Sequence, residues 1–472
     1  MNTEDKVDAS PVKSFFVQML TRDIELSDAI LDLLDNCIDG ILRVKGAASS
    51  KNLYKGFQID ISMSSSSFTI CDNCGGIPFH ILKDYAFRMG RDPRMPHDSV
   101  ATVGTFGIGM KRAIFKMGNR CEVLTRSRVD SEGGAKPVCR VTITPEWIKD
   151  EGDWNIPYVR LSASAYKEYG TKIEISDLNA GTAKIFDCAE TRFDDSIRKQ
   201  IAVTYGFMIN KGLKITVNKQ IVEAVPMVLK CSAEMSPYVY KSKIGDVDVY
   251  LAVGLTAPLL EGDGTPEDGG QSKYSAQNAG WTVMCNDRVV LYADKTILTG
   301  WGEAGVPQFH PQYNPICGIV AFNSKDVRQL PTTTTKRGVD ASNPIYLMVK
   351  NLMREGMRAC IKFTNDWKKR ESEVKGRINA AKSVSFQSMK EDSTGEKVGV
   401  HFVNIGKGNS GMLSKAKLPV PPRKVSEKIC CSVSVEKAKF RRVADYLELS
   451  TASPRTVIQS AFETVYAEAI ES

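Results

Sequence analysis

The stretch that decides the fold is Gly104-Thr105-Phe106-Gly107-Ile108-Gly109-Met110-Lys111. Its glycines allow unusual backbone angles, so that several N–H groups can converge on one anion. Lys111, Arg112 and the apolar residues after them open a helix, and the positive end of a helix can face phosphate. The stretch therefore predicts a phosphate-binding loop at a helix start, with a flexible glycine loop as the simpler alternative.

Two other phosphate-binding motifs do not fit this stretch. A Walker loop needs Lys followed by Ser or Thr directly after its last glycine, whereas here Met110 intervenes and Arg112 follows Lys111. A dinucleotide-binding fingerprint has the order G-x-G-x-x-G, and this chain has G-x-x-G-x-G instead.

Upstream, residues 24–42 have apolar side chains at helical spacing. Asp32 and Asn36 are four residues apart and so share one face of the expected helix. The amide oxygen of Asn36 is a hard ligand that suits Mg²⁺, and a carboxylate one turn away can orient and deprotonate a water. An amphipathic helix with a solvated acidic face is the alternative for this segment alone.

Between these two segments, residues 57–62 and 68–71 are β-prone, and the second run ends at Asp72. A carboxylate at a strand end can accept a hydrogen bond from an exocyclic amine such as that of adenine. Gly75 and Gly76 remove side chains where a flat base would approach the backbone. An ordinary turn explains the same residues if the segment is taken by itself.

Together the three segments resemble the N, G1 and G2 boxes of the GHKL ATPases. This superfamily includes gyrase B subunits, heat-shock chaperones of the ninety-kilodalton class, MutL-type repair proteins, MORC proteins and histidine kinases. Tyr169-Gly170-Thr171-Lys172-Ile173-Glu174-Ile175 resembles the Gly-Thr strand of the family. The resemblance covers roughly residues 20–178 and implies an α/β (α+β) chain that begins with a Bergerat ATP-binding sandwich, with ATP held under a mobile lid.

The resemblance also implies a role for each matched residue. Asn36 is expected to bind Mg²⁺, Asp72 and Thr171 to hold adenine, and Asp32 to act as the catalytic base. The remaining cofactor-binding positions are Gly76, Gly104, Gly107, Gly109 and Lys111, and residues 90–103 are the expected lid.

Two positions depart from the family pattern. The catalytic base of the family is usually Glu, and this chain has the shorter Asp32, which implies slow turnover. Cys74 replaces the first glycine of the adenine box, so the backbone at that point is expected to depend on Gly75.

Composition agrees with a cytoplasmic ATPase. At 472 residues the chain is long enough for two or three domains, and its apolar and charged fractions, 42% and 25%, are those of globular proteins. No apolar run approaches membrane-spanning length, and the N-terminus does not read as a signal peptide. The twelve cysteines lie mostly in apolar runs, as reduced core thiols do, and Cys71-x-x-Cys74 lacks a second pair at zinc spacing. A net charge of +8 permits association with nucleic acid, the nucleoid or the nucleus.

Beyond the ATP-binding domain, assigned to residues 1–180, the pattern mixes helices and strands. Residues 185–340 are expected to form a second α/β domain, with a helix at 197–205, strands at 213–218, 247–253 and 281–286, and an exposed loop at 261–278. This domain resembles the transducer of dimeric GHKL proteins. Lys336, in a Thr-rich stretch at residues 332–338, is then expected to be a catalytic residue that reaches the γ-phosphate. A polar turn with an exposed Lys is the alternative.

Three further segments complete the chain. Residues 341–385 are expected to be a long helix (344–381), and residues 341–382 carry ten Lys or Arg against four Asp or Glu. That basic face suits a phosphate backbone or simply solvent. Residues 386–426 are expected to be a linker, since they are rich in Gly, Ser, Lys and Pro.

Residues 427–472 are expected to form a small β-α-α tail, with a strand at 429–435 and a second helix capped by Ser453 and Pro454. The tail resembles a ribbon-helix-helix subunit, which dimerises by pairing its strand. Reading of DNA by the strand pair, and simple packing of the helices on the rest of the chain, remain open.

The function expected from these patterns is that of an ATP-driven homodimeric clamp of the GHKL class, acting on nucleic acid. A chaperone with a protein client and an ATP-sensing scaffold with little turnover are the alternatives. A histidine kinase is disfavoured, because none of the four histidines precedes Asn36.

Overall fold

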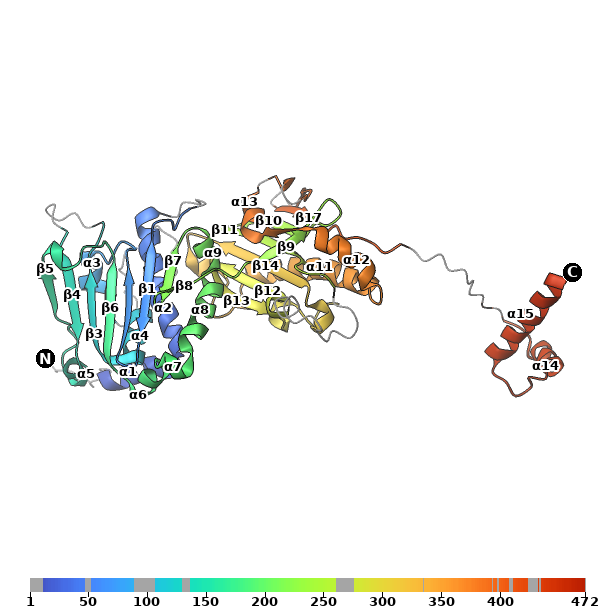
Figure 1. Ribbon diagram of the computed structural model, residues 1–472, viewed down its shortest axis with the longest axis horizontal. Helices are drawn as coiled ribbons and strands as arrows, with labels where there is room; N and C mark the ends of the chain where they lie inside the picture. The colour runs from blue at the N-terminus through green and yellow to red at the C-terminus, as the bar shows by residue number, and fades with distance from the viewer. Residues whose placement is uncertain are drawn as a thin grey trace, which may run out of the picture. The chain divides into compact units, whose positions relative to one another are not determined.

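The computed structural model describes residues 12–46, 52–88, 107–129, 136–259, 276–333, 335–392, 394–396, 399–406, 411–422, 432 and 434–471. The chain divides into two compact units, residues 1–420 and residues 421–472. The larger unit contains two mixed sheets with helices packed on them, which confirms the α/β class (Figure 1).

The first sheet has eight strands in the order β5-β4-β3-β6-β2-β1-β7-β8. All its pairs are antiparallel except β1 with β7. The strands are β1 (Gln58–Met63), β2 (Ser67–Asp72), β3 (Gly118–Thr125), β4 (Val138–Ile143), β5 (Tyr158–Leu161), β6 (Thr171–Leu178), β7 (Lys214–Val217) and β8 (Gln220–Ile221).

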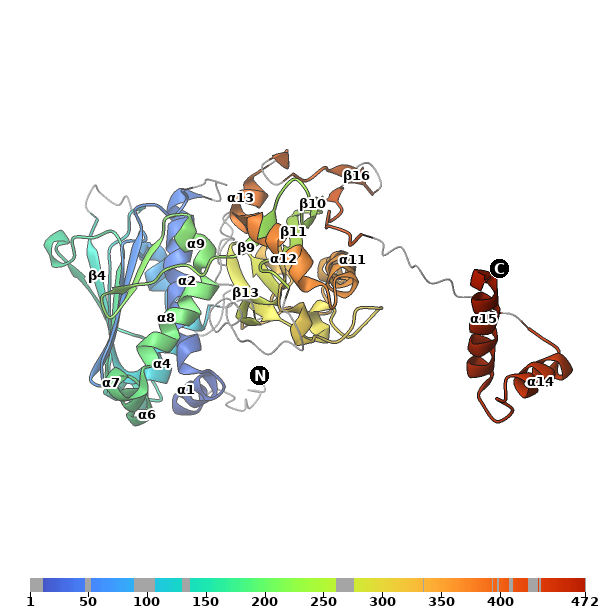
Figure 2. The same cartoon turned by 45° about the vertical axis from the view of Figure 1, so that its right-hand side comes forward.

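Helices cover one face of this sheet, as Figure 2 shows. Along β1, β2 and β6 buried apolar side chains alternate with more exposed polar ones, which is the pattern of a sheet with one solvated face. The helices are α1 (Lys13–Arg22), α2 (Leu26–Lys45), α3 (Phe79–Ile81), α4 (Gly109–Met117), α5 (Pro145–Lys149), α6 (Ala180–Ile185), α7 (Cys188–Thr191), α8 (Phe193–Thr204) and α9 (Gly206–Asn210), with a π-helical turn at Leu82–Ala86.

The first sheet extends beyond the expected limit of the ATP-binding domain at residue 180. The strand expected at 213–218 is β7, and it pairs with β1 rather than joining a second domain. The helix expected at 197–205 is α8, whose Ile197 and Ile201 are buried in the same core as β1. Local sequence could not reveal this, because the pairing of β7 with β1 joins segments about 155 residues apart.

The second sheet has seven strands in the order β13-β12-β14-β11-β10-β17-β16. They are β10 (Tyr238–Ile244), β11 (Val247–Leu255), β12 (Gly280–Cys285), β13 (Arg288–Asp294), β14 (Ile316–Asn323), β16 (Val403–Ile405) and β17 (Gly411–Ser414). Its central strands are buried almost throughout, because α11 (Pro344–Asp366) packs on one face and α13 (Phe386–Glu391) on the other. The α13 side also holds a two-stranded sheet of β9 (Val228–Cys231) and β15 (Lys382–Ser385).

The long helix expected at 344–381 is two helices. Asn343 caps α11 by accepting hydrogen bonds from the N–H groups of Ile345 and Tyr346, as the sequence Asn-Pro suggests. The helix ends near Trp367, whose buried ring turns inward, and Lys369 has a φ of 67°, which breaks the helical path. The second helix is α12 (Glu371–Ala380).

The segment expected to be a linker, residues 386–426, is largely part of the second domain. Phe386 and Met389 of α13 are buried, and β17 pairs with β10 through Leu413 opposite Tyr240. The Gly- and Ser-rich composition misled the prediction, because short strands near the edge of a sheet need few apolar residues once a neighbouring strand supplies the pairing.

The small unit contains α14 (Lys437–Tyr446) and α15 (Pro454–Glu471). Ser453 accepts a hydrogen bond from the Thr456 N–H, so the expected cap is present. Most of the strand expected at 429–435 lies outside the described residues, and Ser432, Ser434 and Val435 are in no regular element. In the described part of the chain, no helix is both long enough and apolar enough to cross a membrane.

Candidate nucleotide-binding site

The first and third motifs meet where α2 passes the start of α4. Asp32 lies on α2 and is 7% exposed, and its Oδ2 is 2.5 Å from an Nη2 of Arg112 on α4. A Cβ placed on Gly109, the first residue of α4, would lie 3.3 Å from Cγ of Asp32. The glycine at this position therefore lets the helix start approach the carboxylate closely.

The amide of Asn36 lies one turn further along α2. Its Nδ2 is buried, and within the described residues it makes no hydrogen bond; the same holds for Nε of Arg112. A buried polar group without a partner is costly, so such a group is a candidate for contact with an ion, a water or a ligand. An amide can turn to present either end, so Asn36 fits a hard cation through its oxygen.

Asp72, at the end of β2, is held by groups from three segments. Its Oδ1 accepts hydrogen bonds from the N–H of Cys74 at 2.7 Å and of Thr171 at 3.3 Å. The thiol of Cys37 on α2 donates to Oδ2 at 3.3 Å. Burial raises the pKa of the Asp72 carboxyl, and these hydrogen bonds act in the opposite direction. The side chain of Cys74 also hydrogen-bonds the carboxyl of Asp72. Thiols are weak donors, so Oδ2 remains a good acceptor for an amine.

The turn after Asp72 depends on glycine at two positions. Gly75 has a φ of +103°, and a Cβ there would lie 2.4 Å from Cγ2 of Val44. Gly76 has a φ of +70°, and a Cβ there would lie 2.1 Å from the carbonyl oxygen of Arg126. Cys74 has no positive φ, so the departure from the family glycine at this position does not disturb the turn.

Thr171 begins β6 beside this turn. Gly170 before it has to be glycine, because a Cβ would lie 1.8 Å from the carbonyl oxygen of Asp72. The hydroxyls of Thr171 and Thr125 are 3.0 Å apart, and both side chains are buried. The Gly-Thr strand is thus adjacent to the expected adenine acceptor.

At the start of α4, Gly107 has a φ of 66° and the cap residue Ile108 makes no side-chain cap hydrogen bond. The first N–H groups of the helix are therefore free of a side-chain cap and can face an anion. Gly104 and the expected lid at 90–103 lie outside the described residues.

Lys111 is 2% exposed, and its Nζ donates to the carbonyls of Ala86, at 3.0 Å, and of Gly107. Burial lowers the pKa of Lys111 to about 8. It is a cation kept at the base of the glycine loop.

The Thr-rich loop at residues 332–338 contacts α2. Nζ of Lys336 lies 2.8 Å from Oδ2 of Asp35, the residue directly before Asn36. Arg337 of the same loop forms an ion pair with Asp28 in the first turn of α2. Lys336 is thus brought next to the nucleotide-site helix, although its role in catalysis stays a prediction.

Sequence reasoning missed three partners of this site: Arg112, Arg288 and Tyr205. Arg112 was visible in the sequence beside Lys111, and its pairing with Asp32 follows from the meeting of α2 with α4. Arg288 and Tyr205 both contact Asp35, but they come from β13 and from the end of α8, and no local pattern announces such a contact.

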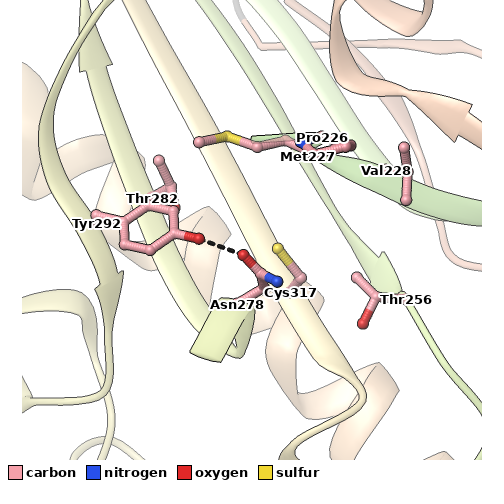
Figure 3. A pocket seen from close by; sticks show the side chains of 8 residues that line it. All are labelled: Pro226, Met227, Val228, Thr256, Asn278, Thr282, Tyr292 and Cys317. Atoms are coloured by element: carbon pink, nitrogen blue, oxygen red, sulfur yellow. Dashed lines mark hydrogen bonds between the residues drawn. The ribbon is translucent and has the colours of Figure 1, made fainter. Parts of the chain in front are cut away.

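A second hollow lies in the second domain, beside β12, β13 and β14, and is unrelated to the three motifs. Figure 3 shows the hydroxyl of Tyr292 directed at Asn278, with Cys317 and Thr282 nearby. Its volume of about 10 Å³ is enough for a single water at most, so it does not hold a nucleotide.

Comparison with known protein families agrees with the geometry. Residues 24–180 match the family described as histidine kinase-, DNA gyrase B-, and HSP90-like ATPase. A comparison with curated proteins gave no match. The matched range contains Asp32, Asn36, Asp72, the glycine loop and Thr171, so this part of the chain is similar to the ATP-binding domains of the GHKL superfamily.

Proposed function

We propose that this chain binds ATP with Mg²⁺ at the site between α2, α4 and the turn after β2, and hydrolyses it slowly. The observation that carries the proposal is the buried, unpartnered Nδ2 of Asn36, one turn from Asp32, which lies against the helix start at Gly109. The described residues contain no group of three or more His, Cys, Asp or Glu side chains suited to a metal. A Mg²⁺ ion here would share its ligands with phosphates, as it usually does.

Each residue has a distinct part in this proposal. Oδ2 of Asp72 accepts the adenine amine, and Gly76 and Thr171 shape the floor of the pocket. Gly107, Gly109 and Lys111 face the phosphates, and Gly104 is assigned to the same group by its position in the motif. When bound to Asn36, Mg²⁺ supplies positive charge to the phosphates. Arg112 fixes Oδ2 of Asp32, so Oδ1 is the atom that orients the attacking water.

The direct test is binding and turnover of ATP by the full chain with and without Mg²⁺. Wild-type protein should bind ATP in the micromolar range and hydrolyse it only with Mg²⁺. Asn36→Ala should reduce Mg²⁺-dependent affinity by about tenfold or more, because the amide is the only proposed protein ligand. Asn52→Ala, on a turn between α2 and β1, is the control for loss of an amide elsewhere. Failure of the wild-type chain to bind ATP would refute the proposal.

We further propose that the ATPase domain works in a homodimeric clamp, with the second sheet as a transducer and nucleic acid as the client. In this scheme Lys336 contacts the γ-phosphate once nucleotide is bound. The dimer proposal is supported by the small unit, because its helices expose large apolar side chains that a second copy could cover. These are Val443, Tyr446, Ile458, Phe462, Val465, Tyr466 and Ile470. Only Ala444 and Val457 of this unit are described as buried apolar residues.

The nucleic-acid client is supported by cations that remain exposed after α11 has packed on its sheet. Lys350 and Arg354 of α11 are paired with Glu303 and so are less available. Exposed Lys and Arg remain from the end of α11 to the start of β15: Lys362, Lys368, Lys369, Lys375, Arg377 and Lys382. Lys362 and Arg377 of this set form surface ion pairs with Asp366 and Glu234, which water and salt screen. Affinity for DNA should fall steeply with salt, with a slope of about −0.9 per phosphate contacted. Weak, salt-insensitive binding would favour the chaperone or scaffold alternative.

A cytoplasmic location, with nucleoid or nuclear association through nucleic acid, completes the proposal. The ten cysteines described are free thiols, most of them buried, which suits a reducing compartment.

A further inference from the structure

Asp35 is the most enclosed charged group on the nucleotide-site helix. It has no exposed surface, although it directly precedes Asn36. Its Oδ1 accepts from Nε of Arg288 at 2.8 Å and from the hydroxyl of Tyr205 at 2.8 Å. Its Oδ2 accepts from Nζ of Lys336 at 2.8 Å. A carboxylate with both oxygens occupied is poorly placed to act as a base, so its function lies elsewhere.

The partners of Asp35 also hold one another. Nη1 of Arg288 donates to the carbonyl of Lys336 at 2.6 Å. Lys336 is therefore held at its backbone by Arg288 and at its Nζ by Asp35. The backbone of Lys336 has a φ of 57°, which a non-glycine residue adopts only when its surroundings hold it there. The side chain of Lys336 is 11% exposed. These contacts define one position of Lys336 relative to α2.

The arrangement joins three parts of the chain. Asp35 belongs to the helix that carries Asn36, Arg288 begins β13 of the second sheet, and Tyr205 follows α8 and also donates to the carbonyl of Leu31 on α2. A buried charge pair of this kind is weak evidence for stability, because desolvation opposes the attraction of the charges. It does, however, fix geometry, and the geometry it fixes here is that of the loop proposed to contact the γ-phosphate.

We propose that Asp35 is a positioning residue that holds Lys336 beside the nucleotide site and gives it up to the terminal phosphate of bound ATP. Nζ of Lys336 exchanges one anionic partner for another, while Arg288 keeps the loop in place through its backbone. Asp35 thereby links occupancy of the site on α2 to the second sheet. This inference rests on the proposed role of Lys336 in ATP hydrolysis.

A second buried carboxylate provides a matched control. Asp287, next to Arg288 in the chain, pairs with Lys211 between α9 and β7 and lies 3.8 Å from Lys390 of α13. It is 9% exposed and, like Asp35, has two Lys or Arg partners from other segments. Neither Lys211 nor Lys390 lies on α2 or in the loop at 332–338. Asp287→Asn therefore removes the carboxylate from a comparable cluster of charges and leaves the partners of Lys336 in place.

The test uses the full chain and two measurements. The first is trypsin cleavage after Lys336 and Arg337 without nucleotide, which reports release of the loop independently of activity. Asp35→Asn should speed this cleavage by at least fivefold, and Asp287→Asn should change it by less than twofold. The second is steady-state ATP hydrolysis, in which Asp35→Asn should lower kcat by at least fivefold and leave KM within threefold.

The double variant separates positioning from general damage. In the Lys336→Met background, Asp35→Asn should lower kcat no further, because the group that it positions is gone. Additive losses, or unchanged loop cleavage or unchanged kcat in a folded Asp35→Asn protein, would overturn the inference. If Asp35→Asn does not fold, trypsin cleavage of the Lys336→Met variant tests the inference instead. Faster cleavage after Arg337 would support the inference, and unaltered cleavage would overturn it. A wild-type chain without ATP binding would instead refute the proposed function, and the nucleotide-free cleavage result would still stand.

Discussion

Lys336 and Asp35 are 301 residues apart in the chain, and Nζ of one lies 2.8 Å from Oδ2 of the other. The range matched to the ATPase family ends at residue 180, so this contact comes from outside it. The nucleotide-site helix is therefore enclosed by two parts of the protein, its own sheet and the loop at residues 332–338. The predictions below test the groups on both sides.

Replacement of Asp72 should impair ATP binding. Asp72→Asn puts an amide where a carboxylate accepts two backbone N–H groups and is proposed to accept the adenine amine. An amide is a weaker acceptor and can present a donor instead, and an unsatisfied buried group costs about 1–3 kcal/mol, or about 5- to 160-fold in affinity. Titration calorimetry with ATP measures the loss. Asp60→Asn on the neighbouring strand β1 is the control, since the carboxylate of Asp60 contacts the side chains of Gln58 and Thr216, which have no proposed role in ATP binding. Equal affinities in the Asp72 variant and the wild type would remove Asp72 from the site.

Replacement of Asp32 should separate binding from hydrolysis. Asp32→Asn keeps the shape and a partner for Arg112 but removes the proposed base, so ATP affinity should stay within about threefold while kcat falls by about 100-fold or more. Phosphate release with saturating ATP measures kcat. If the variant turns over at the wild-type rate, Glu25 becomes the next candidate, because it is exposed at the start of α2, whereas Asp35 is enclosed by its partners.

Binding of ATP should take up protons near pH 8 through Lys111. Burial lowers the pKa of Lys111 to about 8, so about half of the molecules carry the neutral amine at that pH. A nearby triphosphate favours the charged form and raises this pKa, so binding should add about half a proton per ATP. Calorimetry at pH 8 in two buffers of different ionisation enthalpy measures the uptake. The guanidinium of Arg stays charged at this pH, so the Lys111→Arg variant should take up about half a proton less per ATP bound than the wild type. The same uptake in both proteins would contradict the assignment.

The Asp287 cluster should contribute stability that disappears in acid. Burial raises the pKa of Asp287, but Lys211 and Lys390 reverse this and bring the pKa below the usual value of 3.8. A carboxyl with a depressed folded-state pKa stabilises the fold above its unfolded pKa and loses that effect as pH falls through the folded value. Asp287→Asn should therefore cost about 3 kcal/mol at pH 7, measured as a lower Tm. The difference in Tm between the two proteins should shrink below about pH 4. A constant difference from pH 7 to pH 3 would show that the charge of Asp287 is not responsible.

Sequence alone predicted the parts of the site that lie within short motifs. The helix with Asp32 and Asn36, the strand ending at Asp72 and a helix after the glycine loop were all predicted, because each depends on local periodicity or on glycine in tight backbone. The last helix was expected to open at Lys111 and begins at Gly109. The grouping of Arg288 and Tyr205 around Asp35 was not, because each contact joins elements that only the folded chain brings together. Asn286 and Asp287 form the hairpin turn before Arg288, and both have the positive φ that such turns require. What the turn does not reveal is that the side chain after it reaches α2.

The domain limits show the same division between local and distant information. The break in the long helix at Lys369 and the burial of Trp367 depend on packing against the second sheet, which a basic stretch does not announce. The pairing of β17 with β10 placed a Gly- and Ser-rich segment inside the second domain. In both cases tertiary contacts, through packing or strand pairing, determined the structure more strongly than local composition did.

Removal of residues 427–472 should change the oligomeric state without nucleotide. Helix α15 exposes Ile458, Phe462 and Val465 at spacings of four and three residues, which is a continuous apolar stripe. A unit of this size that buries so few apolar residues lacks a core of its own, and a second copy would supply one. The full chain should therefore be dimeric without ATP. The truncated chain should be monomeric without nucleotide and dimerise weakly with a non-hydrolysable ATP analogue, and light scattering distinguishes these states. The full-length variant Phe462→Asp with Val465→Asp is the matched test, because it keeps every residue and disrupts only the stripe. A truncated chain that stays fully dimeric without nucleotide would place the constitutive contact elsewhere.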